Sequence, residues 1–533
     1  MYEAGTATDY LDLLGNLNTF LTSKGSAFAV TFAGTGNGAI SAWAGGASSV
    51  SETFTITFTS ATAFNVVGSV SGSIGSGTVG STFTHAKLTF LISAGGTAFV
   101  AGDAFQLATA PKWTAMRAPN ALSKTRWRVN VRNTVGLAAL EIGEMELMDT
   151  HGGPNLATGG TASASSGSTA ANAFDGNNAT RAILTGTSGW LEYQLPVAKT
   201  IIEFALTLSS STAAGVSAMP RDFTLEVHDG TNWVIVGSFR NETAWGVGER
   251  RVFRLASYIW KAPGNDGVSE IYTGAHLFEN AGTGWYNWRL NGYTAFDASA
   301  DFFDQPGSIK TSQPYGPVLP LTNSAIGYWF FSNGRHVTIV TKCGSVYGAA
   351  YLGLIQPYAS PGQWPYPLFV GGSLYFENSN GEPSSLSTNW LVGTAHGRHT
   401  TFALPFVPLL GTTGDIPTAS SARLRKPDGS WLAFMARSDF YDVKIQSPAG
   451  TVWPYAYGFT NVKPGLDGNY DVFPIILFEK GPDNAYGQLD GVHAITGSGL
   501  SAEATVTIGR DTYIVFPDVT RGAAGDFFAV RID

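Results

Sequence analysis

The first clear pattern in the chain is a run of apolar positions at helical spacing. Five apolar residues between positions 10 and 21 recur every three or four residues: Tyr10, Leu13, Leu14, Leu17 and Leu21. Thr8 or Asp9 can cap the first turn, and Gly25 can end the helix. The pattern predicts one amphipathic helix over residues 9–24. Such a short helix is marginal alone in water, so it must dock on another part of the protein.

After this helix the pattern changes to a period of two. Phe54 and Ile56 alternate with threonines, which indicates a half-buried strand. Glycine clusters at 34–38 and 75–80 punctuate the strands. No Lys-Ser/Thr pair and no helix follows them, so they predict turns rather than phosphate-binding loops. Residues 26–115 are therefore predicted to form a Gly/Thr-rich β-sandwich.

Two breaks in the pattern divide the rest of the chain. Residues 111–124 read as a linker, and residues 261–267 form a second break. Strand patterns return between them, and the chain beyond the second break is strand-like throughout. The sequence therefore predicts an all-β fold of several β-sandwiches with one short N-terminal helix. Its expected parts are the helix (1–25), the first sandwich (26–115), a middle module (126–256) and a C-terminal β-rich region (270–533).

Composition agrees with packed β-structure. Aromatic residues make up 13% of the chain, so it is too apolar to be disordered. The formal net charge of −8 argues against a nucleic-acid-binding protein, which usually has a basic face. No run of about 18 apolar residues predicts a membrane span. Cys343, the only cysteine, lies in a Val/Ile-rich strand, which favours a buried apolar residue and synthesis in a cytoplasm without disulfides.

Residues 126–256 carry a set of motifs found together in one family. The motifs are Asn155-Leu-Ala-Thr-Gly-Gly-Thr-Ala-Ser-Ala-Ser165, Ala173-Phe-Asp-Gly-Asn177 with Thr180, Trp190-Leu-Glu-Tyr193, and the stretch from Pro220 to Trp233. Together they resemble the discoidin family, also called coagulation-factor C-type or galactose-binding-like domains, which includes many carbohydrate-binding modules. The resemblance implies a jelly-roll sandwich with ligand loops at one end. It also implies that the Asp-Gly-Asn loop holds a structural calcium ion.

Calcium takes about six to eight hard oxygen ligands. The resemblance implies Asp175 and Thr180, with backbone carbonyls between them, as part of that set. The family's final strand often ends with a Glu that closes the site. Here the matching strand, 142–146, precedes the loop, so we expect a permuted order in which Glu144 reaches the metal. The alternative is that residues 175–177 form only a tight turn and that Glu144 is a solvated strand residue.

Sugar recognition needs an aromatic face together with planar polar groups for the hydroxyls. Trp190 and Trp233 match positions that pack in the family's core, so they are not expected to bind ligand. Trp245 lies in a predicted loop near Arg250, and these two residues are the expected ligand-binding pair. The alternative is that Trp245 packs against a neighbouring domain or subunit.

Other candidate sites have little support in their sequence context. His396 and His399 lie three residues apart, but side chains so spaced diverge in strands and turns, so no metal site is expected there. No Gly-x-Ser-x-Gly, His-Glu-x-x-His or Cys-x-x-Cys motif occurs. Paired carboxylates for glycoside hydrolysis stay open, because such pairs are distant in sequence. Five aspartates are available, and context singles out none of them: Asp301, Asp304, Asp467, Asp471 and Asp483.

Three further segments are similar to proteins of phage tails: residues 4–14, the first sandwich with Ala98-Phe-Val-Ala-Gly-Asp103, and residues 269–282. The chain as a whole resembles tail or baseplate proteins of tailed bacteriophages. This implies a virion structural protein without enzymatic activity, made in the host bacterial cytoplasm and assembled as a trimer or hexamer. Its expected partners are other tail proteins and, through the module, host-surface glycans or neighbouring tail proteins.

Two alternatives to this function stay open. In the first, the chain is a polysaccharide depolymerase whose C-terminal half cleaves the polymer that the module binds. In the second, its role is purely architectural and the module binds no sugar.

Overall fold

The computed structural model describes residues 1–533 apart from 24, 119–121, 137, 168, 241, 244, 281–284, 310–316, 373–421, 434–469, 480–483, 498, 510, 518–525 and 533. Antiparallel strands dominate, which confirms the predicted all-β, multidomain class. The helices in the described part are α1 (Tyr10–Ser23) and two short 3-10 helices, η1 (Ala170–Ala173) and η2 (Gly215–Ala218). None of the helices among the described residues is long and apolar enough to cross a lipid bilayer.

The N-terminal lobe is a β-sandwich with its own core. One sheet has the order β2 (Ser26–Ala33), β9 (Ala104–Ala110), β4 (Glu52–Phe58), β5 (Ala63–Gly68) and β6 (Gly72–Thr78). The other has the order β3 (Ala39–Gly45), β8 (Leu88–Ser93) and β7 (Thr82–Thr84). Phe54 and Ile56 are fully buried between the sheets, as their alternation with threonine predicts.

The middle module is a second, separate sandwich. Its larger sheet has the order β14 (Thr161–Ala164), β16 (Gly189–Thr200), β11 (Ser123–Thr134), β18 (Pro220–His228) and β19 (Trp233–Phe239). The facing sheet has the order β13 (Glu144–Met148), β17 (Glu203–Thr207) and β20 (Arg250–Arg254). A separate two-stranded sheet consists of β12 (Glu141–Ile142) and β15 (Ala182–Ile183). Trp127, Phe204 and Phe223 are buried between the two sheets.

The remaining strands form three sheets at the centre of the molecule. The first has the order β10 (Thr114–Arg117), β21 (Ser257–Pro263), β22 (Glu270–Asn280), β23 (Trp285–Tyr293) and β24 (Val318–Leu321). The second has the order β1 (Tyr2–Ala7), β25 (Ile326–Ser332), β26 (His336–Cys343), β27 (Val346–Leu354), β29 (Leu368–Gly372), β30 (Ala422–Arg425) and β31 (Trp431–Ala433). The third has the order β28 (Gln356–Pro357), β33 (Asn484–Thr496), β36 (Asp526–Arg531), β35 (Asp511–Pro517) and β34 (Thr505–Ile508), with β32 (Phe473–Glu479) also on β33.

The sheet of seven strands is buried on both faces. Phe330 and Ile339 point into a core shared with α1 and the sheet that contains β22. Phe331 and Val340 point the other way, into a core shared with the sheet that contains β33. A strand buried on both sides needs apolar residues at successive positions, which explains the continuous apolar runs in this part of the sequence. Cys343 is buried here as well, and burial raises the pKa of its thiol to about 12.

Helix α1 docks on the central sheets as its apolar stripe requires. The stripe residues are all buried in the shared core: Tyr10, Leu13, Leu14, Leu17 and Leu21, joined by Phe20. Asp9 is the N-cap, because its Oδ1 accepts hydrogen bonds from the backbone N–H groups of Leu11 at 2.8 Å and Asp12 at 2.9 Å. The indole of Trp288 donates to the backbone carbonyl of Tyr10 at 3.1 Å.

Two connections differ from the sequence-based expectation. Strand β1 precedes the helix and pairs antiparallel with β25, placing Tyr2 opposite Phe331. The segment 111–124, expected as a linker, contains β10, which pairs with β21. Both strands are short, so neither shows enough period-two pattern to be recognised without its partner.

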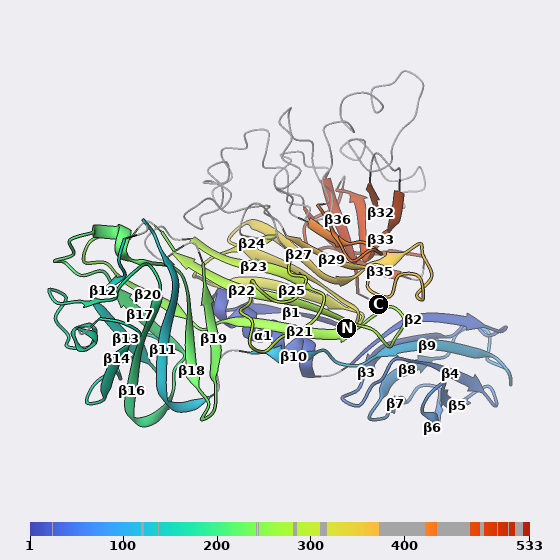
Figure 1. The fold of residues 1–533 in the computed structure, drawn as a ribbon. Helices are drawn as coiled ribbons and strands as arrows, with labels where there is room; N and C mark the ends of the chain where they lie inside the picture. Colours follow the sequence, from blue (N-terminus) through green and yellow to red (C-terminus); the bar gives the residue numbers. More distant parts are fainter. Residues whose placement is uncertain are drawn as a thin grey trace, which may run out of the picture.

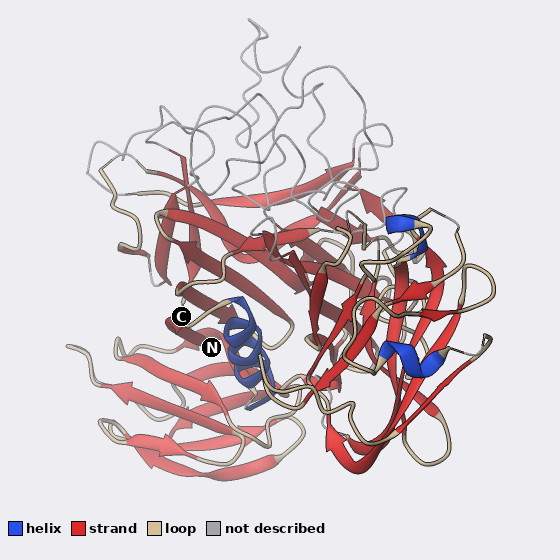
Figure 2. Ribbon diagram, turned by 90° about the vertical axis from the view of Figure 1, so that its left-hand side faces the viewer, coloured by secondary structure: helices blue, strands red, loops and turns tan. Residues whose placement is uncertain are grey.

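The three parts are arranged around the central sheets. Figure 1 shows the N-terminal lobe and the module at opposite ends of the molecule, with the central sheets between them and both termini close to the middle. Figure 2 shows α1 lying between the lobes, beside the central sheets. The module therefore presents its sheets and loops away from the N-terminal lobe.

Candidate functional site

The Asp-Gly-Asn loop of the module is a compact turn held by its own side chains. Asp175 Oδ1 accepts the backbone N–H of Asn177 at 2.8 Å, and Thr180 Oγ1 donates to Asp175 Oδ2 at 2.8 Å. Gly176 has φ of 73°, a left-handed conformation that a residue with a Cβ rarely adopts. This geometry fixes the Asp175 carboxylate in place, close to the end of the sandwich.

Glu144, at the start of β13, reaches this loop from the facing sheet. Its side chain lies within hydrogen-bonding reach of Asp175 and is only 8% exposed. Burial, together with the neighbouring Asp175 carboxyl, raises the pKa of Glu144 to about 7, although the backbone N–H groups of Gly176 and Asn177 act in the opposite direction. Two carboxyl groups this close are compatible only if a proton or a cation lies between them.

The donor set around Glu144 fits a hard cation. Glu144 Oε1 and Asn178 Oδ1 are both buried and have no hydrogen-bond partner within the described part of the chain. The carboxylate of Asp175 and the backbone carbonyl of Asn177 lie in the same loop. Among the described residues no cluster of three or more His, Cys, Asp or Glu side chains exists, so two carboxylates and neutral oxygens would make up the ligand set. The structure thus brings together Glu144, Asp175 and Thr180, the three residues named from the sequence.

The expected ligand-binding pair, Trp245 and Arg250, is not placed to stack on a sugar. Trp245 is only 4% exposed, and its indole N–H donates to the backbone carbonyls of Pro220 and Glu242. The guanidinium of Arg251, not Arg250, lies 4.1 Å from the centre of its ring. The prediction of a solvent-facing stacking residue is therefore wrong: the loop turns Trp245 inward, into the module's own core.

Arg250 is exposed but already engaged on β20. Its guanidinium forms two hydrogen bonds with Glu146, at 2.7 and 2.8 Å. Because Trp245 is buried and Arg250 is paired with Glu146, the structure does not unite them in one binding site.

Trp190 and Trp233, expected in the core, lie on the outer face of the larger sheet. On β16, Leu191 and Tyr193 point inward, so Trp190 and Glu192 point outward. Trp233, the first residue of β19, is half-buried outside the core cluster. The period-two alternation of β16 contained this information, but the family resemblance favoured the opposite orientation.

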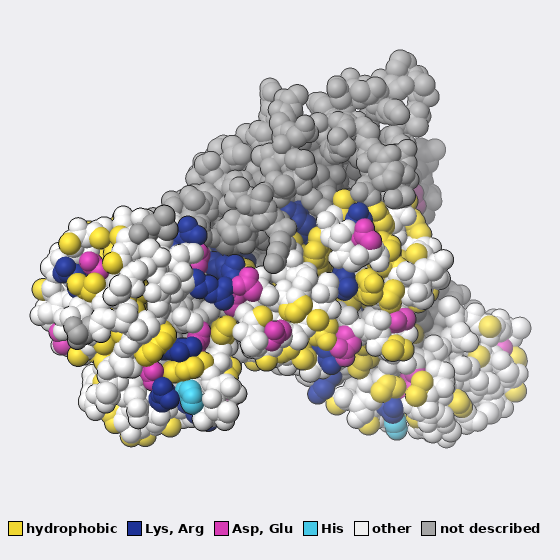
Figure 3. Space-filling view, viewed as in Figure 1, with side chains coloured by type: hydrophobic (Ala, Val, Ile, Leu, Met, Phe, Trp, Pro, Cys, Tyr) yellow, Lys and Arg dark blue, Asp and Glu magenta, His cyan; other side chains and the backbone are white. Residues whose placement is uncertain are grey.

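The same outer face carries arginines paired with buried glutamates. Arg126 binds Glu192 at 2.6 Å, and Arg128 binds Glu226 at 2.6 Å. The Arg128 guanidinium lies 4.1 Å from the ring centre of Trp233 and 5.9 Å from that of Trp190. We call these residues, together with Asn130 and Thr224, the sheet-face cluster. Figure 3 shows hydrophobic, basic, acidic and histidine side chains gathered on this part of the module, over β11, β16 and β18.

Of the acidic residues considered for hydrolysis, Asp301 and Asp304 do not form a free carboxylate pair. Asp301 lies 2.8 Å from Arg132 and 3.0 Å from Arg240, and Asp304 lies 2.5 and 2.6 Å from the same arginines. The arginines hold the pKa of the Asp304 carboxyl below its usual value against the effect of burial. Asp471 is exposed. The remaining residues set aside in the sequence lie outside the described residues: Asp467, Asp483, His396 and His399.

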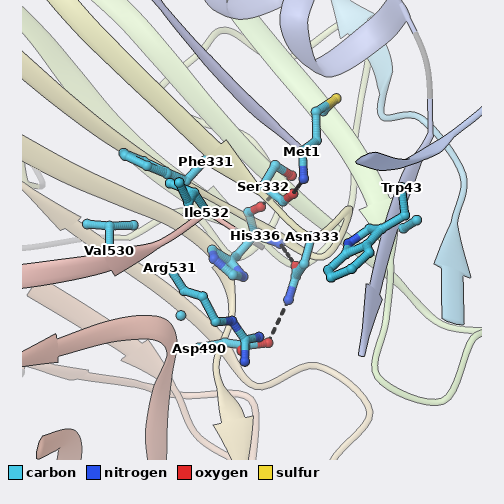
Figure 4. Close-up of a pocket in the computed structure, with 12 residues that line it drawn as sticks. Met1, Trp43, Phe331, Ser332, Asn333, His336, Asp490, Val530, Arg531 and Ile532 are labelled. Carbon is cyan, nitrogen blue, oxygen red and sulfur yellow. Dashed lines mark hydrogen bonds between the residues drawn. The ribbon is translucent and has the colours of Figure 1, made fainter. Parts of the chain in front are cut away.

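A small recess lies where the N-terminal lobe and two central sheets meet (Figure 4). Trp43 approaches from the N-terminal lobe, His336 from β26, and Asp490 from β33. Asn333 donates a hydrogen bond to Asp490 at 2.6 Å. The recess holds about 50 Å³, far below the roughly 300 Å³ or more of a small-molecule pocket, so it is a polar junction between lobes.

The module therefore offers two surfaces with the chemistry of a binding site. One is the loop end with Glu144 and Asp175, which suits a hard cation. The other is the sheet-face cluster, which combines indoles with planar polar groups. No protein-family model matches the chain, and no curated protein matches it.

Proposed function

We propose that this protein is a structural component of a bacteriophage tail tip or baseplate, and that residues 126–256 form a calcium-stabilised module binding host-surface glycans or neighbouring tail proteins. The observation that carries the proposal is the contact of Glu144 with Asp175, two residues distant in sequence. The resemblance of the sequence to discoidin modules implies this contact. A chance resemblance confined to the loop motif would give no reason to expect it.

A calcium ion at this place would neutralise the two carboxyl groups and hold β13 against the loop. Glu144 and Asp175 would supply the charged oxygens, with Asn178 Oδ1 and the Asn177 carbonyl as neutral ligands. The test is thermal unfolding at pH 8 in chelator and in calcium. We expect calcium to raise the midpoint of the wild-type module transition and to leave Glu144→Gln unchanged, with magnesium as the control ion. An equal response of both proteins would contradict the site.

Glycan binding is tested on the full chain. Purified protein is applied to an array of immobilised neutral and acidic oligosaccharides, with calcium and with chelator. We expect retention of a subset of glycans that weakens when calcium is removed, because the module loses the cation that stabilises its fold. Retention of no glycan under either condition would leave the architectural role as the function.

Assembly into a particle is tested separately. We expect antibodies against the chain to label the tail of a virion, and light scattering to show a closed oligomer such as a trimer or hexamer. The low content of charged residues, 13% of the chain, suits a protein that buries surface against copies and other tail proteins. A monomer whose antibodies label no virion would contradict the proposal.

The depolymerase alternative has less support. A glycosidase needs one carboxyl of raised pKa as its general acid and a second carboxylate about 5–10 Å away, whereas Glu144 and Asp175 are in hydrogen-bonding contact. Asp301 and Asp304 are instead neutralised by two arginines. Incubation with host capsule or lipopolysaccharide, followed by measurement of new reducing ends, tests this alternative, and we expect no release.

A further inference from the structure

We propose that the sheet-face cluster, rather than the loop end of the module, is the platform that binds an uncharged oligosaccharide. The inference rests on the proposed glycan-binding function and assigns its site. Trp190 and Trp233 supply the apolar faces, and the groups between them supply hydrogen bonds. It follows from side-chain orientation, unused hydrogen-bonding capacity, charge and rigidity.

The two indoles are placed as a pair of stacking surfaces. Trp190 stands on β16 and Trp233 on β19, and the guanidinium of Arg128 lies over both rings, 5.9 Å from the ring centre of Trp190 and 4.1 Å from that of Trp233. Arg126 lies 5.2 Å from the ring centre of Trp233 and is 40% exposed at its side chain. Apolar rings and planar guanidiniums thus lie in contact on one face, where the C–H faces and hydroxyls of a sugar chain find both kinds of partner.

The hydrogen-bonding capacity of these indoles is unused. Trp127 and Trp245, which are buried in the module, donate their indole N–H groups to backbone carbonyls. For Trp190 and Trp233 the described residues provide no acceptor for the indole N–H. Gln194, on the same face of β16, is exposed and adds an amide to the set. A tryptophan that only stabilised the sheet would not need a free donor.

The charges on the face favour an uncharged ligand. Glu192 and Glu226 are nearly buried, and each is neutralised by one arginine, Arg126 or Arg128. Asn130 and Thr224 also donate to Glu226, at 2.9 and 2.8 Å. The pairs leave no uncompensated charge between the indoles to attract an acidic polymer. Because the pairs also fix the side chains in advance, binding costs little conformational entropy.

Paired arginines lie at both ends of this face along β11. Arg132, further along β11, is paired with Asp301 and Asp304 of the central region, and its side chain stays 41% exposed. Arg126 and Trp233 lie at the other end and are partly exposed.

The test uses the full chain and the best-retained neutral oligosaccharide of the array, measured by titration calorimetry. We expect Trp233→Ala and Trp190→Ala each to weaken binding at least tenfold, and Trp233→Phe to restore part of it, because a smaller ring still stacks. The matched control is Tyr358→Ala, which removes an aromatic side chain that is 54% exposed in the central region and should leave binding unchanged. Circular dichroism and thermal unfolding establish that each variant is folded.

The outcomes separate the site from the function. If the wild type binds neutral glycans and the double variant Trp190→Ala/Trp233→Ala binds them equally well, the platform is wrong and the glycan-binding function stands. If the wild type retains no glycan, both fail. If it retains only acidic glycans, with affinity that falls steeply as salt rises, the assignment to an uncharged ligand is overturned.

Discussion

At the scale of single residues, Glu144 is the most informative group in the module. Its carboxyl is buried beside Asp175, and its pKa is raised to about 7 from an ordinary 4.5. In the folded protein without a cation it therefore holds a proton that the unfolded chain has already released between about pH 4.5 and 7. The folded state binds more protons in this window, so the module's stability falls as pH rises through it.

This sign gives a measurable prediction. In chelator, the free energy of unfolding of the module should fall by at most about 3 kcal/mol between pH 4.5 and 8, from a pKa of about 7 in the folded state. Glu144→Gln should remove most of the slope, since a neutral amide does not titrate. Glu146→Gln, two residues along the same strand, is the control and should keep the slope. Urea unfolding across this pH range measures the slope for each protein. Equal slopes for all three proteins would contradict a proton shared between Glu144 and Asp175.

Calcium affinity should follow the same group. Because the cation competes with the Glu144 proton, the affinity of the wild type for calcium should rise as pH increases from about 5.5 to 8. Calorimetric titration of the wild type at these two pH values measures the change. Affinity that is constant with pH would mean that Glu144 is not a ligand.

At the scale of elements, α1 shows how a short helix obtains its stability from packing. Its sequence has the apolar stripe and the Asp9 cap, but the buried surface comes from the central sheets. Leu14 is fully buried, whereas Thr19 is exposed on the opposite side of the helix. The contribution of each position should follow that burial rather than helix propensity.

Substitutions along α1 test this account. Leu14→Ala should cost about 2–5 kcal/mol, through lost burial and a cavity. Asp9→Ala should cost about 1 kcal/mol, because two backbone N–H groups lose their acceptor. Thr19→Ala, the control, should change the free energy of unfolding by no more than about 0.5 kcal/mol. Chemical unfolding of the full chain followed by tryptophan fluorescence measures all three, and an equal cost at Leu14 and Thr19 would show that α1 is not docked.

At the scale of the whole molecule, we expect the module and the centre to respond to pH in opposite directions. His336, buried where the lobes meet, has its pKa lowered to about 4, chiefly by burial. Its neutral form is the stable one in the folded protein. The stability that it contributes is complete above about pH 6.5 and is lost as pH falls from 6.5 towards 4. His493, with a pKa likewise lowered to about 4 by burial, acts in the same sense on β33.

Scanning calorimetry should therefore resolve two unfolding transitions whose midpoints shift in opposite directions with pH. On going from pH 7 to pH 5 in chelator, the midpoint of the central region should fall and that of the module should rise. The cause is that His336 is a base buried in the central region, whereas Glu144 is an acid buried in the module. His336→Gln should reduce the fall, and His85→Gln in the N-terminal lobe should leave it unchanged. A single transition, or two that shift together, would contradict the independence of the two cores.

Local pattern was enough to predict several features of this protein. The helix over Tyr10–Ser23, its Asp9 cap and the alternation around Phe54 follow from hydrogen-bond geometry that repeats every 3.6 or 2 residues. This geometry acts between near neighbours, so a sequence records it directly. The residues of the candidate calcium site were named instead from the resemblance to discoidin modules, because Glu144 and Asp175 are distant in sequence.

Other features depended on contacts between distant segments. The pairing of β1 with β25, the inward turn of Trp245 and the outward position of Trp233 were not predicted, or were predicted wrongly. In each case the segment is short or irregular, and its orientation is set by which surface of a remote element it buries. Chain periodicity therefore determined the all-β class and the docking helix, whereas the tertiary structure decided which aromatic side chains face the solvent, because burial is a property of the assembled sheets and not of a local stretch of residues.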